Sequence, residues 1–408
     1  MNSSFLPGLY VHIPFCVRKC TYCDFLSFGR KDAESLFGSC DYPGIYFDAL
    51  VKQLEYLAGA AGSGIGVCGA KVPGTFDTVY IGGGTPCILP EGMIYRLLGK
   101  IKKLFDISND AEITIELNPG VVTGNKLSEY KNAGVNRVSA GIQSLNGDLL
   151  RTLGRIHSKD EALGSLALIG KFFENVNADF IFGIPSVKNV SPAQTEEDIA
   201  ECLDAVFSYG LPHASFYSLI IEPGTDMYEK TAAGLTEEFD ADEERKIYRL
   251  ISAEMKEKGY IHYEISNFAK PGSESSHNMK YWSGRDYLGA GLGAVSYLGV
   301  TDKASRDHVR FRTVTSPSGY VEGSSGGDVY ETQERLDTVS RKKEYMMMGF
   351  RKTAGPDPRD YGILFGSDLF GDFSCELQEL SADGLIRQDL SLTDKGLDFG
   401  NLIFEKFI

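Results

Sequence analysis

Three of the eight cysteines stand close together in the spacing Cys16-x3-Cys20-x2-Cys23, directly after a short apolar run at residues 10–13. Such a group of thiols is better explained by a bound metal centre than by three core side chains. The other cysteines are scattered singly, and a small apolar side chain in the core explains each of them. They are Cys40, Cys68, Cys87, Cys202 and Cys375.

The clustered cysteines fit an iron–sulfur centre better than the alternatives. A [4Fe–4S] cluster normally takes four protein thiolates, so three cysteines leave one iron open to a small-molecule ligand. A zinc site would need a distant fourth ligand such as His12 or Cys40. Zinc sites also commonly repeat the C-x2-C pair, which this chain has only once. We therefore rank iron–sulfur above zinc, and both above three structural cysteines.

The charge and hydropathy patterns limit the partners and the location. With 41 basic and 56 acidic residues the formal net charge is −15, which argues against nucleic acid because phosphates need a basic surface. No apolar run reaches the roughly 20 residues that span a bilayer, so we expect no transmembrane segment. The first residues lack the basic and apolar regions of a signal peptide. We expect a cytoplasmic protein with reduced thiols.

Short apolar runs alternate with longer amphipathic stretches between residues 10 and 221. Several runs are β-branched or aromatic, as in strands that are buried on both faces of a parallel sheet. One intervening segment carries helix signals at both ends, with Thr195 and Asp198 as a capping box and Gly210 as a terminator. Six successive β-α units predict an α/β fold, either an α/β sheet or a partial (β/α)6 barrel, and in barrels the active site lies at the carboxyl ends of the strands. The expected strands are residues 10–13, 78–81, 112–117, 137–141, 177–182 and 214–221.

The rest of the chain predicts a second, smaller unit. Residues 59–74 and 316–328 are rich in glycine, alanine or serine, and we expect flexible surface loops there. Residues 331–350 show a helix pattern, and residues 373–408 follow the order helix, turn, short strand pair and helix. The expected domains are a core barrel with its extension at 1–298, a flexible hairpin or linker at 299–329, and a winged-helix-like C-terminal domain at 330–408.

The cysteine spacing, with the aromatic Tyr22 before the last cysteine, resembles that of the radical S-adenosylmethionine superfamily. Further matches follow in order, so the resemblance spans nearly the whole chain. It implies that the amino and carboxylate groups of S-adenosylmethionine chelate the open iron of a [4Fe–4S] cluster. One electron from the cluster would then cleave the sulfonium to methionine and a 5′-deoxyadenosyl radical.

Polar residues at or just after the ends of the expected strands are the candidate ligands of that cofactor. The second strand ends in Gly82-Gly83-Gly84-Thr85, and glycine lets backbone carbonyls approach the methionyl ammonium group closely. Taken alone, each polar residue has a plain explanation as a solvated, capping or ion-paired side chain. The resemblance implies that the cofactor-binding residues are Tyr10, Tyr22, Gly83, Gly84, Thr85, Glu116, Gln143, Arg155 and Asp179.

Within the superfamily, the chain resembles the oxygen-independent coproporphyrinogen III oxidases and their haem-chaperone paralogues. The motifs that carry this resemblance are YVHIPFC, IGGGTP, SAGIQSLN, LGRIHS and FIFGIP. The oxidases have a further cysteine two positions after the third cluster cysteine, where this chain has Asp24-Phe25. They also have a long N-terminal extension, whereas nine residues precede Tyr10 here. Both differences favour the chaperone branch.

Residues 277–282 read HNMKYW and match the HNxxYW signature of the chaperone branch. A neutral imidazole can ligate haem iron while aromatic rings pack on the macrocycle. An isolated histidine would be better interpreted as a structural residue, but the whole pattern favours a ligand. The implied haem-binding residues are His277, Asn278, Tyr281 and Trp282.

We therefore expect a haem chaperone that binds haem and transfers it to apo-haemoproteins, with the cluster and S-adenosylmethionine supporting haem handling or the formation of a homodimer. Whether the protein is also an enzyme stays open, and no catalytic residue is assigned. The alternative is a coproporphyrinogen III oxidase, a dehydrogenase-type oxidoreductase of porphyrin biosynthesis that decarboxylates propionate side chains. A zinc-stabilised binding protein is a third, weaker alternative.

Overall fold

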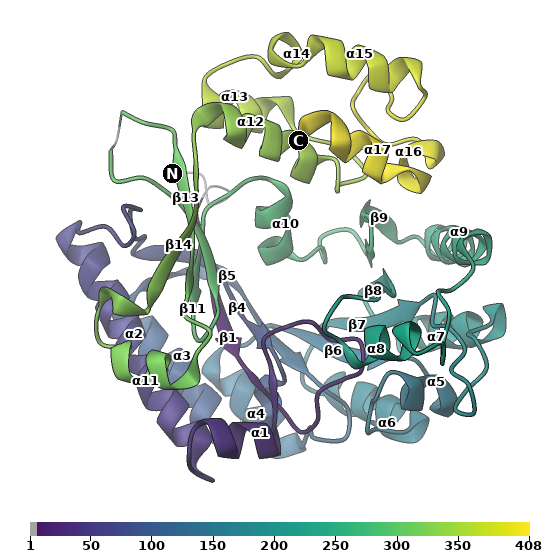
Figure 1. Cartoon of the computed structure of the whole chain (residues 1–408), viewed down its shortest axis with the longest axis horizontal. Helices are drawn as coiled ribbons and strands as arrows, with labels where there is room; N and C mark the ends of the chain where they lie inside the picture. The colour runs from purple at the N-terminus through teal and green to yellow at the C-terminus, as the bar shows by residue number, and fades with distance from the viewer. Residues whose placement is uncertain (1–5, 303) are drawn as a thin grey trace.

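The computed structural model of the protein describes residues 6–302 and 304–408, and its centre is a sheet of twelve strands (Figure 1). The strand order is β14-β13-β12-β11-β1-β4-β5-β6-β7-β8-β10-β9. Residues 1–5 of the expected barrel domain and residue 303 of the expected linker lie outside the described residues. None of the described helices is long and apolar enough to cross a membrane.

Six parallel strands in the middle of the sheet confirm the expected β-α order. They are β1 Gly8–Ile13, β4 Thr75–Gly83, β5 Asp106–Leu117, β6 Arg137–Gln143, β7 Asn175–Phe182 and β8 His213–Ser218. The helices between them are α2 Tyr42–Ser63, α3 Met93–Leu104, α4 Gly124–Ala133, α5 Gly147–Thr152, α6 Lys159–Ile169 and α7 Glu196–Ser208. They cover the outer side of the curved sheet in Figure 1. β8 pairs with β10 instead of β1, so the barrel is open, as expected of a partial barrel.

The helix α7 shows how local sequence fixes these elements. The Thr195 hydroxyl accepts a hydrogen bond from the Asp198 N–H, and the Asp198 carboxylate accepts one from the Thr195 N–H at 2.8 Å. This capping box supplies partners for amide groups that the first helical turn cannot pair. Just past the helix, Gly210 takes a left-handed φ of +59°. Both ends of this helix are therefore confirmed.

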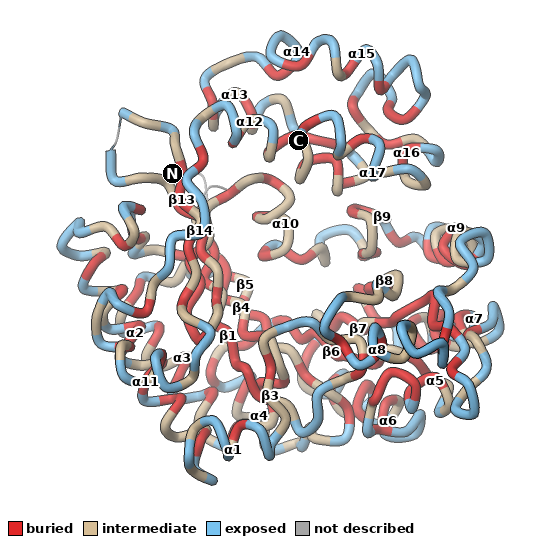
Figure 2. Tube along the Cα trace, in the orientation of Figure 1, coloured by how far each residue is buried: buried red, intermediate tan, exposed pale blue. Residues whose placement is uncertain are grey.

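The inner side of the parallel strands is polar. On β4, Val79 and Ile81 are buried in the apolar core beneath the helices, while Thr78 and Tyr80 take the alternate positions on the other side. Figure 2 shows these strands as mostly buried, as predicted, yet the residues inside the barrel are chiefly hydrogen-bonding groups. The inner positions hold Tyr80, Thr114, Glu116, Arg137, Ser139, Asn177, Asp179, Ser215 and Tyr217.

Further strands extend both edges of the parallel sheet. On the β8 side, two helices come before these strands in the chain. Beyond β1 lie β11 Tyr287–Ala290, which is parallel to it, and the antiparallel strands β12 Val295–Gly299, β13 His308–Thr313 and β14 Tyr330–Leu336. After β8 the chain forms α8 Asp226–Ala232 and α9 Ala241–Glu257, and then the antiparallel strands β9 Ile261–Glu264 and β10 Asn267–Ala269.

Three sequence-based expectations are wrong in this region. Residues 331–336 do not begin a helix, because they pair with β13 as part of β14. The expected loop at 316–328 contains α11 Pro317–Gly323, whose Tyr320 is buried and donates a hydrogen bond to Gln53 Oε1 at 2.7 Å. The expected loop at 59–74 begins inside α2, which continues to Ser63.

The C-terminal region is helical, as expected, and has its own apolar cluster, which includes Met346, Phe350 and Leu380. Its helices are α12 Thr338–Gly349, α13 Pro358–Phe365, α14 Leu369–Asp372, α15 Ser374–Ala382, α16 Asp394–Asp398 and α17 Gly400–Phe404. The expected strand pair is reduced to one bridge between Ile386 and Leu392. The division into three domains stays a prediction.

Candidate functional site

The loop that carries the three clustered cysteines is held at both of its ends. Cys16 lies in β2 Phe15–Cys16, which pairs with β3 Phe28–Gly29 after the loop. In the middle, the Thr21 N–H donates to the Leu153 carbonyl at 3.1 Å, and the Thr21 hydroxyl donates to the Thr152 carbonyl at 2.8 Å. These bonds fix the loop against the end of α5. The three thiols are free of disulfides and line one cavity.

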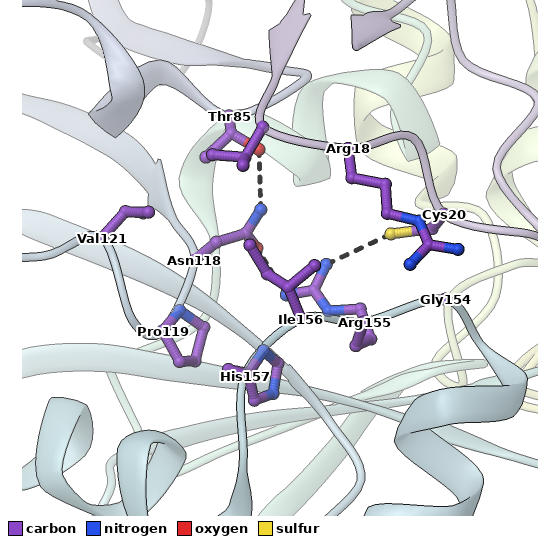
Figure 3. A pocket seen from close by; sticks show the side chains of 11 residues that line it. Arg18, Cys20, Thr85, Asn118, Pro119, Val121, Gly154, Arg155, Ile156 and His157 are labelled. Carbon is purple, nitrogen blue, oxygen red and sulfur yellow. Dashed lines mark hydrogen bonds between the residues drawn. The ribbon is translucent and has the colours of Figure 1, made fainter. Parts of the chain in front are cut away.

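A chain of hydrogen bonds connects two of these thiols, those of Cys16 and Cys20, through Asn118, which lies just past the end of β5. Figure 3 shows the part of this chain between Thr85 and Cys20. The Asn118 amide donates to Thr85 Oγ1 at 2.7 Å, and Thr85 Oγ1 donates to Cys16 Sγ at 3.5 Å. On the other side, Arg155 donates to Asn118 Oδ1 at 2.7 Å and to Cys20 Sγ at 3.5 Å. Asn118 is not among the residues predicted from the sequence. The signal was its place at a strand end, two residues after Glu116.

The glycine run at the end of β4 allows this strand to meet the cysteine loop. Gly83 has a φ of +110°, and a Cβ atom there would collide with the His12 ring. A Cβ atom on Gly84 would lie 2.6 Å from the Phe15 carbonyl oxygen. The neighbouring amides are used instead, since Gly84 N–H donates to the Ile13 carbonyl and Thr85 N–H to the Phe15 carbonyl. Only glycine fits these two positions.

The cavity beside the thiols has a volume of about 440 Å³ and lies at the carboxyl ends of the parallel strands. It brings together almost all the residues that the sequence predicts for the cluster and the cofactor. These are Cys16, Cys20, Tyr22, Cys23, Gly83, Gly84, Thr85, Glu116, Gln143, Arg155 and Asp179. The exception is Tyr10, which does not line the cavity and whose hydroxyl lies 2.9 Å from His12 Nδ1.

Two half-buried carboxyl groups, those of Glu116 and Asp179, face the cavity. Glu116 accepts hydrogen bonds from the Tyr80 hydroxyl at 2.8 Å and the Gly83 N–H at 3.0 Å. Burial, with a smaller effect from the charge of Asp179, raises the pKa of Glu116 to about 7. Asp179 accepts from Ser139 and Asn177, both at 2.8 Å, and burial raises its pKa as well. Both groups are placed to accept hydrogen bonds from the hydroxyl groups of a ligand.

Gln143 adds backbone strain at the rim of the cavity. Its φ of +67° is left-handed, which is unfavourable for a residue with a Cβ atom, and the pairing of β6 with β7 is irregular at Gly141–Gln143. Strain of this kind persists only where the surrounding structure imposes it, and it is often found at functional sites. The irregularity places the Gln143 side chain on the cavity wall, beside the Asp179 strand.

The HNxxYW segment lies elsewhere. It forms α10 Ser276–Trp282, whose first amides, those of Ser276 and His277, donate to the Glu112 carboxylate at 2.9 and 3.0 Å. His277 is 1% exposed; its Nδ1 lies 2.8 Å from Thr78 Oγ1 and its Nε2 lies 2.9 Å from the Tyr281 hydroxyl. Burial and the nearby Lys280 lower the pKa of His277 to about 3, so its imidazole is neutral.

The structure thus separates the predicted haem residues from the cavity. His277, Asn278, Tyr281 and Trp282 are not among the residues that line it. Trp282 packs instead under the guanidinium of Arg351, at 4.6 Å from the ring centre. In the described arrangement both nitrogens of His277 already have partners, so its role as a haem ligand stays a prediction that requires these contacts to open.

Comparison with known proteins gives concordant results. The family model described as the radical SAM superfamily matches residues 10–199. The heme chaperone HemW of Bacillus subtilis (strain 168) is 32% identical over 409 residues, covering 99% of this chain and 99% of that protein. The heme chaperone HemW of Escherichia coli (strain K12) is 30% identical, covering 98% of each.

Among solved structures, the chain is similar to the coproporphyrinogen III oxidase HemN of Escherichia coli, a radical SAM enzyme. The match covers 99% of this chain and 90% of the oxidase with a TM-score of 0.76, at 22% sequence identity. At that identity the likeness shows that the fold is shared, and it does not transfer the activity of the oxidase.

Proposed function

The chain belongs to the radical SAM superfamily and, within it, to the family of the heme chaperone HemW, and on this basis we propose that it binds haem and delivers it to apo-haemoproteins. The observation that carries the proposal is the similarity to HemW over 99% of both chains, which includes the C-terminal helices as well as the barrel. The HNMKYW segment of α10 adds the chaperone signature within that alignment. Haem is the cargo in this function.

Cys16, Cys20 and Cys23 would hold a [4Fe–4S] cluster. Among the described residues, no three His, Cys, Asp or Glu side chains converge closely enough to hold a single metal ion, yet these three thiols line one cavity. That arrangement suits a cluster, which offers a separate iron to each thiolate, better than it suits zinc. Hydrogen bonds to Cys16 and Cys20 from Thr85 and Arg155 would also stabilise thiolate ligands.

S-adenosylmethionine would occupy the adjoining cavity. Glu116 and Asp179 would accept hydrogen bonds from its hydroxyl groups, the glycine run would approach its methionyl end, and Arg155 and Gln143 would complete the wall. When bound, the cluster supplies an electron that cleaves the sulfonium of this cofactor. In a chaperone the cofactors need only support haem handling, so we propose no reaction of a further substrate.

The second candidate is the oxidative decarboxylation of coproporphyrinogen III, favoured by the shared fold with HemN. The two residues that follow the last cluster cysteine argue against this activity. Asp24 and Phe25 line the cavity here, where the oxidases carry a further cysteine. A cytoplasmic location and a homodimer stay predictions for either function.

One experiment separates the two candidates. The anaerobically reconstituted protein is titrated with haem and, separately, incubated with coproporphyrinogen III and S-adenosylmethionine. The chaperone proposal predicts saturable haem binding, seen as a shifted Soret band, and no loss of carbon dioxide from the porphyrinogen. Robust decarboxylation would contradict the proposal even if haem also binds.

A further inference from the structure

Arg137 occupies an unusual place at the start of β6. Its side chain is only 2% exposed, which makes it the largest fully buried side chain in the described part of the protein. Ser139 and Gly141, which follow at alternate positions of the same strand, line the cavity beside the cluster loop. Because side chains alternate along a strand, Arg137 extends from the same face into the barrel.

Within residues 6–302 and 304–408, the guanidinium of Arg137 has no direct partner. Its Nε atom is buried without a hydrogen bond, and no hydrogen bond or ion pair joins its other nitrogens to any of the residues that the structure describes. Other buried arginines in this chain are paired: Arg285 lies 2.5 Å from the Asp360 carboxylate, and Arg341 donates to the Tyr297 hydroxyl at 3.2 Å. A buried, unpaired charge is unfavourable, and a bound anionic ligand would neutralise the charge of Arg137.

The two carboxyl groups of the cavity do not fill this role. Burial raises the pKa of Glu116, Asp179 and Tyr80, and the positive charge of Arg137 opposes part of that rise, so the guanidinium lies within electrostatic reach of the cavity floor. Yet Glu116 is bonded to Tyr80 and Gly83, and Asp179 to Ser139 and Asn177. Both carboxyl groups are satisfied by other donors, and the guanidinium is left for a ligand.

We propose that Arg137 binds a carboxylate that enters the barrel from the cavity, and that this carboxylate is a propionate group of haem; the second half of the proposal rests on the proposed function. A guanidinium pairs with a carboxylate through two parallel hydrogen bonds, which fits an arginine without a protein partner. Ser139 on the cavity floor is two residues from Arg137, or about 6.6 Å along the strand, so a flexible acid side chain can cover the distance.

S-adenosylmethionine is the other source of a carboxylate. Its carboxylate is expected at the open iron of the cluster, whose thiol ligands lie at the carboxyl ends of the strands, whereas Arg137 is the first residue of β6. The two carboxylates therefore belong at different depths of the barrel, and the haem propionate is the one assigned to Arg137.

The test combines a change in the protein with a change in the ligand. Haem and haem dimethyl ester, in which both propionates are blocked, are titrated into the holoprotein and into Arg137→Gln, Arg137→Lys and, as a matched control, Arg312→Gln on the exposed side of β13. The wild type and the control should bind haem about tenfold to a hundredfold more tightly than the ester, the range expected for hydrogen bonds to a charged group. Arg137→Gln should lose this preference and keep its affinity for the ester, and Arg137→Lys should retain part of it.

Each other outcome overturns a defined part of the proposal. If the wild type binds haem and its ester with equal affinity, the assignment of a propionate to Arg137 is wrong. This comparison needs no variant, so the proposal can be tested even if a variant folds poorly. If Arg137→Gln still binds haem more tightly than the ester, the propionate is bound by a residue other than Arg137. Weaker binding of S-adenosylmethionine in Arg137→Gln, with the haem preference intact, assigns Arg137 to the cofactor. If the wild type binds neither haem nor its ester, the proposed function itself fails, and the haem assignment fails with it.

Discussion

The Nδ1 atom of His277 lies 2.8 Å from the hydroxyl oxygen of Thr78, and this contact connects α10 to the first residue of β4 that pairs with β1. The cysteine loop, in contrast, follows the carboxyl ends of the parallel strands. The HNxxYW helix and the cluster loop therefore lie at opposite ends of the barrel (Figure 1). The polar residues inside the barrel therefore lie between the HNxxYW helix at one end and the cluster loop at the other.

This contact makes Thr78 a test of the haem ligand. If His277 must release Thr78 to bind iron, Thr78→Val should strengthen haem binding about twofold to tenfold, because one hydrogen bond no longer has to break. His277→Ala should alter or abolish the Soret band while the iron–sulfur content stays normal. An unchanged Soret spectrum in His277→Ala would return this histidine to a purely structural role.

The three cluster cysteines should each be essential for the chromophore. Replacing Cys16, Cys20 or Cys23 with alanine should abolish the brown absorption at roughly 400 nm, because the cluster already has one thiolate fewer than usual. Cys40 and Cys375, which are exposed, are matched controls and should tolerate alanine without loss of iron. Full iron and sulfide content in a single cluster mutant would exclude the assignment.

Asn118 should tune the cluster through the side chains that it holds. In Asn118→Ala, Thr85 and Arg155 lose the bonds that aim them at Cys16 and Cys20. Since hydrogen bonds to the sulfurs influence the potential of a cluster, the midpoint potential should become more negative while iron content stays normal. Potentiometry followed by electron paramagnetic resonance measures this shift. The exposed Asn401→Ala serves as the control, and equal potentials in both variants would refute a positioning role.

The two carboxyl groups of the cavity should contribute to cofactor affinity. Alanine at Glu116 or Asp179 should weaken S-adenosylmethionine binding by about tenfold to a hundredfold, because a hydrogen bond to a charged group is worth about 1.5–3 kcal/mol. Cluster iron should be unaffected. Calorimetric titration compares these variants with the exposed Glu197→Ala. Unchanged affinity in both Glu116→Ala and Asp179→Ala would assign these residues to structure alone.

Stability should depend on pH through Glu116. Its pKa is raised from an ordinary value of 4.5 to about 7, so between these values the folded protein keeps a proton that the unfolded chain has lost. The free energy of unfolding contributed by this group is therefore highest below pH 4.5, falls as the pH rises to about 7, and then levels off. Urea unfolding of the wild type and of Glu116→Gln at several pH values gives the difference between their free energies of unfolding. This difference should become smaller toward low pH, where Glu116 is protonated in both the folded and the unfolded chain. A constant difference would show that the pKa is not raised.

The sequence predicts the strands and α7 well because their signals are local. Short runs such as residues 177–182, which end in Phe180-Ile181-Phe182, have the length of a strand, and Thr195 with Asp198 defines a helix start within four residues. Reasoning from local sequence fails where contacts with residues far away in the chain determine the secondary structure. Glu331 and Glu334 suit a helix, yet pairing with β13 makes them part of β14. The serine- and glycine-rich stretch at 316–328 is ordered by Tyr320, which contacts a residue 267 positions away.

The candidate site shows the same division. Nearly all of the residues predicted for the cluster and the cofactor, from the cysteine spacing and the family resemblance, do line the cavity, because parallel strands bring their carboxyl ends together. The roles of Asn118 and Arg137 could not be read in advance. The first depends on side chains from three separate segments, which are the ends of β4 and β5 and the loop after α5. The second depends on the absence of a partner among the described residues, which a sequence does not reveal.

Haem delivery can be measured as the transfer of haem to an acceptor. Anaerobically reconstituted protein loaded with haem is mixed with an apo-haemoprotein; at successive times the two proteins are separated by size and the Soret spectrum of each is recorded. We expect haem to move to the acceptor, and His277→Ala to load and transfer less of it. If haem never leaves the loaded protein, or if the wild type fails to load haem, the protein is not a haem chaperone.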